Sequence, residues 1–405
     1  MNITINHINK IAHHQHYKLT KIINQHQHLS YYSSKPSSAI LDFSSISKHL
    51  SKDEYNNLQD TFKKEYVLKK KPVLLRGLAK DWNAVSAWNN NDTQQYVKNQ
   101  YGNRKVQIQF SQNSKYDALN ASGEMEYSAV STMTVNDFWN EYVEKNVDRG
   151  DYAYITEGSS SITKKAERIN ENKDESSSTI TYRDILNDAS FNTNSTDKNQ
   201  THTIFQQPFF DDPNFNADKH MTKSLLWIAA GNAIAAPHRD LYHNFNVTIS
   251  GKKIFYLIPP CKFKEVYDFP RMSYRLQRLG KEGKRYSKNM ITSDEGDPLL
   301  TRGFSSLNFK ELYENKEDPM PLKFMCLPGD VIYLPYNYYH HVYSTCDDEN
   351  KSIAINFWQT SLFGIDIETD KDPFNGSQLE KEIVKNAVIV ENLKMIEEYE
   401  NRAYD

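Results

Sequence analysis

Short apolar segments, many of them bounded by Gly or Pro, dominate the second half of the chain. The segments that predict β-strands are 224–229, 244–249, 253–258, 324–327, 331–334 and 352–358. Ser250-Gly251-Lys252 predicts a tight hairpin turn, and the prolines at 259, 260 and 335 end strands. Many short strands separated in this way predict an antiparallel sandwich or barrel, and hence a mainly β fold class with flanking helices.

Residues 41–156 mix helical and strand periodicities, and we expect an α/β part that packs on the β-rich core. Trp82 and Trp88 are expected to anchor its hydrophobic core, as large aromatic residues usually do. The predicted elements are strands at 73–75, 106–110 and 152–155, a helix that follows a capping box at 51–54 and ends before Pro72, and a helix over 135–143.

Polar stretches dilute this folded part. Residues 1–40 hold six of the 13 histidines among Asn, Gln and Ser, which predicts a disordered tail, although a His-rich tract can also bind metal. Residues 157–202, rich in Ser, Asn, Asp and Lys, predict a disordered surface insertion. The core is therefore expected at 203–362, interrupted by a mostly irregular insert at 261–323.

The segment 363–405 predicts a helix that begins at Ser377, where Glu380 completes a capping box. Its apolar residues recur at spacings of three and four and make one broad stripe: Leu379, Ile383, Ala387, Val390, Leu393 and Ile396. Such a stripe must pack on another surface, which is either the chain's own barrel or a second copy. A homodimer through this helix is therefore one of two open alternatives, since two-fold dimers are the commonest oligomers.

Composition and charge narrow the class of protein. The 405 residues carry 49 basic and 52 acidic side chains, a net charge of −3, which argues against a dedicated nucleic-acid binder. No run reaches about 18 apolar residues, so a membrane span is excluded. Three cysteines are too few for a disulfide framework or a cysteine-only tetrahedral metal site, and they indicate a reducing compartment, cytoplasm or nucleus. Because the tail has four lysines and no acid before Asp42, organelle targeting stays open, although arginine is absent.

Four of the seven histidines outside the tail gather in two places, which are Pro237-His238-Arg239-Asp240 with His243, and Tyr339-His340-His341. In an extended chain residues i and i+2 point to one face, so His238 and Asp240 can reach one ion together. A further histidine from a distant strand completes two histidines and a carboxylate, the ligand set of non-haem Fe(II) oxygenases. His340 and His341 face opposite ways on a strand, so only one can join, and the residues alone do not choose. The alternative is a buried, hydrogen-bonded His–Asp pair.

Two polar positions on predicted strands suggest a binding pocket. Lys253 shares one strand face with Phe255 and Leu257, where a lysine is costly unless it is paired. It either binds the distal carboxylate of a dicarboxylate co-substrate or faces water. Asn356 shares a face with Trp358, and an inward Asn needs partners, either a co-substrate carboxylate or hydrogen bonds within the core.

Three stretches carry a family resemblance: LLWIAAGNAIAAPHRDLYHNFNVTISGKKIFYLIPP, LPGDVIYLPYNYYHHVYS and SIAINFWQ, in that order. Together they resemble the JmjC family of Fe(II)- and 2-oxoglutarate-dependent dioxygenases. PVLLRGLAKDWNAVSAW also looks like the entry segment of the small JmjC hydroxylases. The resemblance covers 204–362 well and 42–156 loosely, and it implies a double-stranded β-helix, the cupin or jelly-roll core.

Carried over motif by motif, the resemblance implies an iron site and a co-substrate site. The iron ligands are His238, Asp240 and His340, and Lys253 binds the C5 carboxylate of 2-oxoglutarate. Asn244 and Asn356 match asparagines near the co-substrate, and Trp227 and Trp358 match aromatic residues that line the pocket. Ala235 departs from the pattern, because many members carry Thr or Ser there; Tyr152 or Tyr154 is the expected replacement.

The resemblance is closest to the jumonji-domain-seven lysyl hydroxylase type, which implies O₂-dependent hydroxylation of a protein side chain, with lysine favoured. The alternatives are an RNA or tRNA-base hydroxylase, an N-methyl-lysine demethylase and a non-catalytic cupin binding protein. The stretch 271–288 carries seven basic residues against Glu282, with Tyr274 and Tyr286 interleaved. It is either a solvated basic face or a docking site for an acidic partner or RNA.

Overall fold

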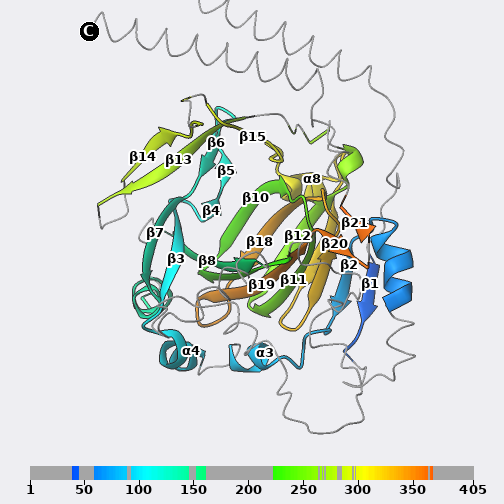
Figure 1. Ribbon diagram of the computed structural model, residues 1–405, viewed down its shortest axis with the longest axis horizontal. Helices are drawn as coiled ribbons and strands as arrows, with labels where there is room; N and C mark the ends of the chain where they lie inside the picture. The colour runs from blue at the N-terminus through cyan, green and yellow to red at the C-terminus, as the bar shows by residue number, and fades with distance from the viewer. Residues whose placement is uncertain are drawn as a thin grey trace, which may run out of the picture.

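Two facing β-sheets lie at the centre of the molecule in the computed structural model (Figure 1). The structure describes residues 39–44, 59–88, 93–145, 152–160, 222–262, 265–266, 268, 271–280, 285–293, 296, 298–363 and 365–367. Residues 1–38 of the predicted tail, the predicted insertion from residue 161 onwards and the helix predicted from Ser377 lie outside these ranges. None of the described helices is long and apolar enough to cross a membrane.

The larger sheet has nine strands within the described ranges and contains both early and late parts of the chain. Its order is β1 (Ala39–Asp42), β2 (Val73–Arg76), β17 (Val331–Leu334), β11 (His243–Ser250), β19 (Lys351–Gln359), β9 (Thr222–Ala230), β8 (Tyr152–Ser160), β3 (Lys105–Ser111) and β7 (Ala129–Thr134). β8 pairs with β9 as far as Ser160, so four residues of the segment predicted as a disordered insertion are strand.

The second sheet completes the core and carries both histidine clusters. Its order is β16 (Leu322–Cys326), β12 (Lys252–Ile258), β18 (Tyr339–Thr345), β10 (Ala233–Arg239) and β4 (Lys115–Tyr116). The six strands predicted in the core segment are all present, as β9, β11, β12, β16, β17 and β19. The mainly β fold class is therefore confirmed.

Side chains of both sheets interdigitate to form the inner core. Leu74 and Ile332 of the larger sheet pack against Phe255, Leu257 and Phe324 of the second sheet. Because side chains alternate along a strand, the opposite residues of the larger sheet point outward, and Phe245 and Phe357 join a second apolar cluster there. Strands such as β12 and β17 are thus buried on both faces, which explains why they are apolar at nearly every position.

Helical turns from the N-terminal part cover this outer face. They are η1 (Lys63–Val67), α3 (Asn83–Ala87), α4 (Thr93–Tyr101), α5 (Val135–Phe138) and η2 (Trp139–Val143), of which η1 and η2 are π-helical. Trp82 and Trp88 are buried in the same cluster, as predicted, and Trp82 meets Phe357 edge to face with the ring centroids 6.1 Å apart.

The described residues of the insert at 261–323 form strands and helices, so for them the prediction of a mostly irregular segment was wrong. Its elements are η3 (Pro260–Lys262), β13 (Arg271–Leu279), β14 (Arg285–Met290), β15 (Leu300–Thr301) and α8 (Phe309–Asn315). β13 pairs in parallel with β6 (Met125–Tyr127), which pairs with β5 (Ala118–Leu119), and Figure 1 shows β13 and β14 as a hairpin beside them. α8 packs Phe309 and Leu312 on the outer face of the second sheet. The partner of β13 lies about 150 residues earlier, so the local pattern did not reveal it. Two short strands, β20 (Ser361–Leu362) and β21 (Ile365–Asp366), follow the core.

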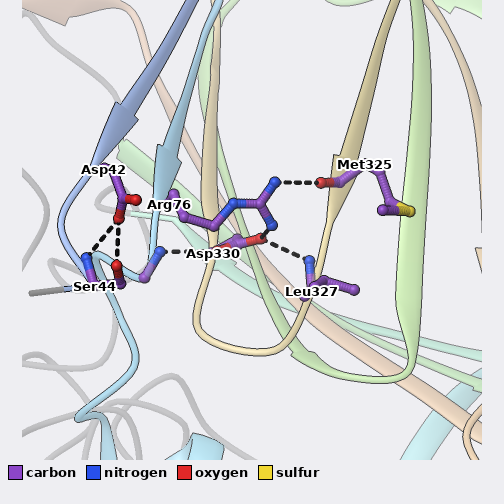
Figure 2. Close-up of polar contacts among 7 residues, drawn as sticks. Asp42, Ser44, Arg76, Met325, Leu327 and Asp330 are labelled. Atoms are coloured by element: carbon purple, nitrogen blue, oxygen red, sulfur yellow. Dashed lines mark hydrogen bonds and ion pairs between the residues drawn. The ribbon is translucent and has the colours of Figure 1, made fainter.

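A buried carboxylate joins the N-terminal part to the core (Figure 2). Asp330, in the turn between β16 and β17, accepts hydrogen bonds from the backbone N–H groups of Gly77 and Leu327, both at 2.8 Å. Arg76 Nη1 lies 2.6 Å from Asp330 Oδ2, and Arg76 Nη2 donates to the carbonyl of Met325 at 3.3 Å. The Asp330 side chain is 2% exposed, and burial raises its pKa despite these partners.

We expect Asp330→Ala to lower the free energy of unfolding by about 3 kcal/mol, because it leaves the guanidinium and two N–H groups without their acceptor. Asp42→Ala is the matched control, since Asp42 is an exposed neighbouring carboxylate that accepts its hydrogen bonds from Ser44. Urea denaturation measures both variants. Equal effects of the two substitutions would show that Asp330 does not join the two parts.

Candidate metal centre and its pocket

A β-bulge in β10 determines which way His238 points. β10 pairs with β18, and the register shifts between Ala235, opposite Val342, and His238, opposite His340. Three residues of β10 therefore span two of β18, and Pro237, which has no N–H for the ladder, lies inside the bulge. Without the extra residue His238 would face away from the side of Ala235. The bulge returns it to the inner face, opposite His340.

His238, Asp240 and His340 converge at this point. The three side chains offer ligand atoms that all lie within 4.8 Å of one another. Asp240 Oδ1 is 3.9 Å from His238 Nε2, Asp240 Oδ2 is 3.6 Å from His340 Nε2, and the imidazole centroids are 4.1 Å apart. Within the described part of the chain, it is the one cluster of three His, Cys, Asp or Glu residues that could hold a metal ion.

Backbone carbonyls orient both imidazoles. His238 Nδ1 lies 2.6 Å from the carbonyl oxygen of Ala236, and His340 Nδ1 lies 3.0 Å from that of Tyr338. A carbonyl oxygen only accepts, so Nδ1 carries a proton in each ring, and Nε2 is the ring atom that faces the cluster. Burial, with His238 beside it, lowers the pKa of His340 to about 4, so the ring is neutral at pH 7. Two imidazoles and a carboxylate suit a divalent transition metal such as Fe(II).

The middle residue of the H-x-D motif points to the opposite side and is fixed there. Arg239 Nε lies 2.9 Å from Asp268 Oδ2, and Arg239 Nη1 donates to Asn337 Oδ1 at 2.5 Å. Asp268, whose side chain is fully buried, also accepts from Tyr339 Oη at 2.7 Å and from the N–H of Gly303 at 2.8 Å. This network joins β10, β18 and the insert directly behind the cluster.

The structure separates the two neighbouring histidines. His341 lies on the outer face of β18, where its ring meets Tyr343 at 4.6 Å and Phe309 of α8 at 6.1 Å. Burial lowers the pKa of His341 to about 3, so it is a neutral core residue. His340 is therefore the one that shares a face with His238 and Asp240.

A pocket opens in front of the cluster and extends between the two sheets. Its empty volume, including the open mouth, is about 960 Å³. All eight site residues predicted from the sequence line it: Trp227, His238, Asp240, Asn244, Lys253, His340, Asn356 and Trp358. Side chains that we did not predict also line it, and the most informative are Tyr116, Asp117, Asn246, Phe304 and Ser344.

Lys253 is buried, not solvated. It lies on the inner face of β12, is 5% exposed and donates from Nζ to Ser344 Oγ at 3.0 Å. Ser344 is in turn hydrogen-bonded to Tyr154. Burial lowers the pKa of Lys253 to about 8, because no carboxylate is paired with it in the described part of the chain. The ammonium and two hydroxyl groups are a ready-made site for a carboxylate.

The family follows from comparison with known proteins. A family model for the cupin-like domain matches residues 59–364, and the similar proteins include several that are named for a JmjC domain. The chain belongs to the JmjC family of cupin-like domains. This membership confirms the jelly-roll core that the resemblance implied.

Three relatives show how far the similarity extends. JmjC domain-containing protein E of Dictyostelium discoideum is 24% identical over 329 residues, which cover 75% of this chain and 82% of that protein. Lysine-specific demethylase JMJ32 of Arabidopsis thaliana is 29% identical over 153 residues, 35% of this chain and 42% of that protein. JmjC domain-containing protein D of Dictyostelium discoideum is 23% identical over 286 residues, 70% of this chain and 51% of that protein. The match thus spans most of the first relative but about half or less of the other two.

Two hydroxyl groups, those of Tyr154 and Ser344, lie in the pocket to which Ala235 contributes none. Tyr154 lines the pocket and reaches Ser344, whereas Tyr152 is outside the lining. Ser344 lies on β18 two residues beyond Val342 and four beyond His340, so it shares their inward face. With His340 taken as a ligand, this even spacing along the strand would have predicted that Ser344 faces the pocket. Asn246 had the same signal, two residues from Asn244 on β11.

Several buried polar atoms of the pocket lack partners within the described residues. They include Asn244 Oδ1, Asn246 Oδ1 and Trp227 Nε1. Buried polar groups are usually hydrogen-bonded, so these atoms favour a polar ligand or ordered water in the pocket. Asn246 Nδ2 donates to Asn356 Oδ1, which holds the two amides together on neighbouring strands. The residues present therefore fit a metal ion together with a dicarboxylate.

We expect His340→Ala to weaken binding of Fe(II) or Mn(II) by more than the about 10–100-fold that loss of an outer-shell partner costs, because it removes a ligand. His341→Ala should leave metal affinity within about threefold but destabilise the fold by about 2–4 kcal/mol, since a buried ring is deleted. Calorimetric metal titration and urea denaturation measure the two effects. A reversed pattern would make His341 the ligand.

Proposed function

We propose that the protein is an Fe(II)- and 2-oxoglutarate-dependent dioxygenase that hydroxylates a protein side chain, with lysine favoured. The observation that carries the proposal is the distribution of groups within one pocket. A cluster of metal-binding type lies on one wall, and Lys253 with Ser344 and Tyr154 lies deeper between the sheets. A dicarboxylate whose keto-acid end reaches a metal and whose far carboxylate needs a cation matches this arrangement.

The roles of the chain's residues follow from this arrangement. His238, Asp240 and His340 would hold the iron, which when bound supplies the activation of O₂ for C–H oxidation. Lys253, with the hydroxyl groups of Ser344 and Tyr154, would bind and orient the far carboxylate of 2-oxoglutarate. Asn244, Asn246 and Asn356 would hydrogen-bond the co-substrate, while Trp227 and Trp358 exclude water from its flanks. Phe304, stacked on His238 with the centroids 5.8 Å apart, walls the mouth.

A protein substrate has more support than RNA. The basic strands β13 and β14 make many contacts within the chain: Arg278 stacks on Phe110, with the charge centre 4.5 Å from the ring centroid, and Lys288 pairs with Glu124 and Glu126. Tyr274 is buried beneath Lys288, so it is not available to stack on a base.

Demethylation of N-methyl-lysine is the second candidate, because a relative that matches 35% of this chain is named a lysine-specific demethylase. The same metal and co-substrate groups serve both reactions. Demethylation differs in that oxidation falls on the N-methyl carbon, so the position of the substrate nitrogen decides between them.

Mass spectrometry of lysyl and N-methyl-lysyl peptide libraries, incubated with the full chain, Fe(II), 2-oxoglutarate and O₂, tests the proposal. We expect succinate formation and the gain of one oxygen atom on a lysyl peptide. Loss of a methylene unit from a methylated peptide would favour the demethylase instead. If Fe(II) and 2-oxoglutarate bind but no peptide or RNA substrate leads to succinate formation, the result would favour a non-catalytic binding protein.

Affinity for 2-oxoglutarate should depend on pH through Lys253. Its pKa in the empty pocket is about 8, so it is positively charged below that pH and progressively neutral above it. The apparent Kd should therefore be flat below pH 8 and rise by up to about tenfold per pH unit above it.

Lys253→Met should weaken binding of 2-oxoglutarate at pH 7 by about 2–5 kcal/mol and remove this pH dependence. Lys252→Met, one residue along β12, is the control, and a flat wild-type profile would place the carboxylate elsewhere.

A further inference from the structure

The pocket contains one carboxylate that neither the metal cluster nor the co-substrate site uses. Apart from Asp240, the acidic residue that lines it is Asp117, which is the single residue between β4 and β5. Lys253, the lysine that lines the pocket, donates a hydrogen bond to Ser344. Asp117 is half-buried, and within the described residues no lysine or arginine lies within ion-pair distance of it.

The backbone holds Asp117 in an uncommon conformation. Its φ is +49°, in the left-handed region that non-glycine residues seldom adopt, although Asp and Asn tolerate it best. Reciprocal hydrogen bonds with Ser128 maintain this conformation: Ser128 N–H donates to Asp117 Oδ1 at 2.8 Å, and Asp117 N–H donates to Ser128 Oγ at 3.1 Å. One carboxylate oxygen is therefore anchored, and the other has no hydrogen-bond donor within the described part of the chain.

Aromatic residues line the same pocket as this carboxylate. Tyr116 precedes it, and its ring lies 5.0 Å from that of Tyr154. Phe304 reaches across from the insert, and it also meets Tyr127 edge to face at 6.5 Å. A half-buried anion is costly when alone and attracts a cation, and the faces of aromatic rings in the same pocket do so too.

We propose that Asp117 determines specificity by binding the cationic end of the substrate side chain. The inference rests on the proposed function and deepens it, because it names the residue that would favour an ammonium group. Lys253 attracts the anionic co-substrate and Asp117 attracts the cationic substrate. The same carboxylate would disfavour an acidic side chain or a nucleotide phosphate.

A binding experiment without turnover tests this. The full chain is loaded with Mn(II) and 2-oxoglutarate and titrated with N-acetyl-lysine methylamide, or with the uncharged analogue in which a methyl group replaces the ammonium. Broadening of probe resonances by Mn(II), followed by NMR, reports binding near the metal. We expect the lysine probe to bind about 10–100-fold more tightly than its analogue, as hydrogen bonds to charged groups do.

Asp117→Asn should reduce this preference to within about threefold. The amide keeps an oxygen for the Ser128 N–H and suits the left-handed backbone, so the fold has no reason to change. Glu314→Gln, which neutralises an exposed carboxylate of α8, is the matched control and should keep the wild-type preference. No preference in the wild type, no broadening of the lysine probe, or a full preference in Asp117→Asn would each overturn the proposal.

Titration of Mn(II) and 2-oxoglutarate alone separates this inference from the proposed function. If neither ligand binds the wild type, the proposed function fails, and this inference fails with it. If both bind and the lysine preference is absent, only the role of Asp117 fails. The affinity of Asp117→Asn for Mn(II) and 2-oxoglutarate is measured in the same samples, so a loss confined to the lysine probe is recognised.

Discussion

The pairing of β10 with β18 is the constraint on which the site depends. The bulge at Pro237 places His238 opposite His340, and the two imidazoles then meet Asp240 within one small volume. A shift of one residue in this register would turn His238 toward α8 and bring Arg239 into the pocket. The buried ion pair of Arg239 with Asp268 opposes that shift, because breaking it would leave a charge in the core.

The same alternation organises the proposed co-substrate site. On β18 the inward residues after His340 are Val342 and Ser344, and on β12 Lys253 is inward with Phe255 and Leu257. The asparagines of β11 and β19 face the pocket, while their neighbours Phe245 and Phe357 face the helices. A polar inner face would be unfavourable in an ordinary sandwich. Here a ligand is expected to supply the missing hydrogen bonds, so the strands combine apolar outer faces with a partly polar interior.

Much of this arrangement could be predicted from local sequence, and the failures have one cause. Strand positions, the face that Lys253 shares with Phe255 and Leu257, and the approach of His238 to Asp240 follow from residue spacing alone. The choice between His340 and His341 required the register of two strands about 100 residues apart, which spacing does not contain. The strands of the insert were not predicted for the same reason, since β13 pairs with β6 of the N-terminal part. Phe304 and Asp117 reach the pocket from those two segments and had no local signal. The His-rich tail and the C-terminal helix stay predictions.

Opposite charges in one pocket would also order the binding of two substrates. Lys253 is buried without a counter-charge, and its pKa of about 8 reflects the cost of keeping it protonated there. A dicarboxylate offsets that cost at the inner end, whereas an ammonium group placed beside Lys253 would add to it. Beside Asp117, which lines the same pocket, the preference would be reversed. The anionic co-substrate is then expected to occupy the interior first and the cationic side chain to enter after it. This follows because each charge repels the wrong occupant as well as attracting the right one.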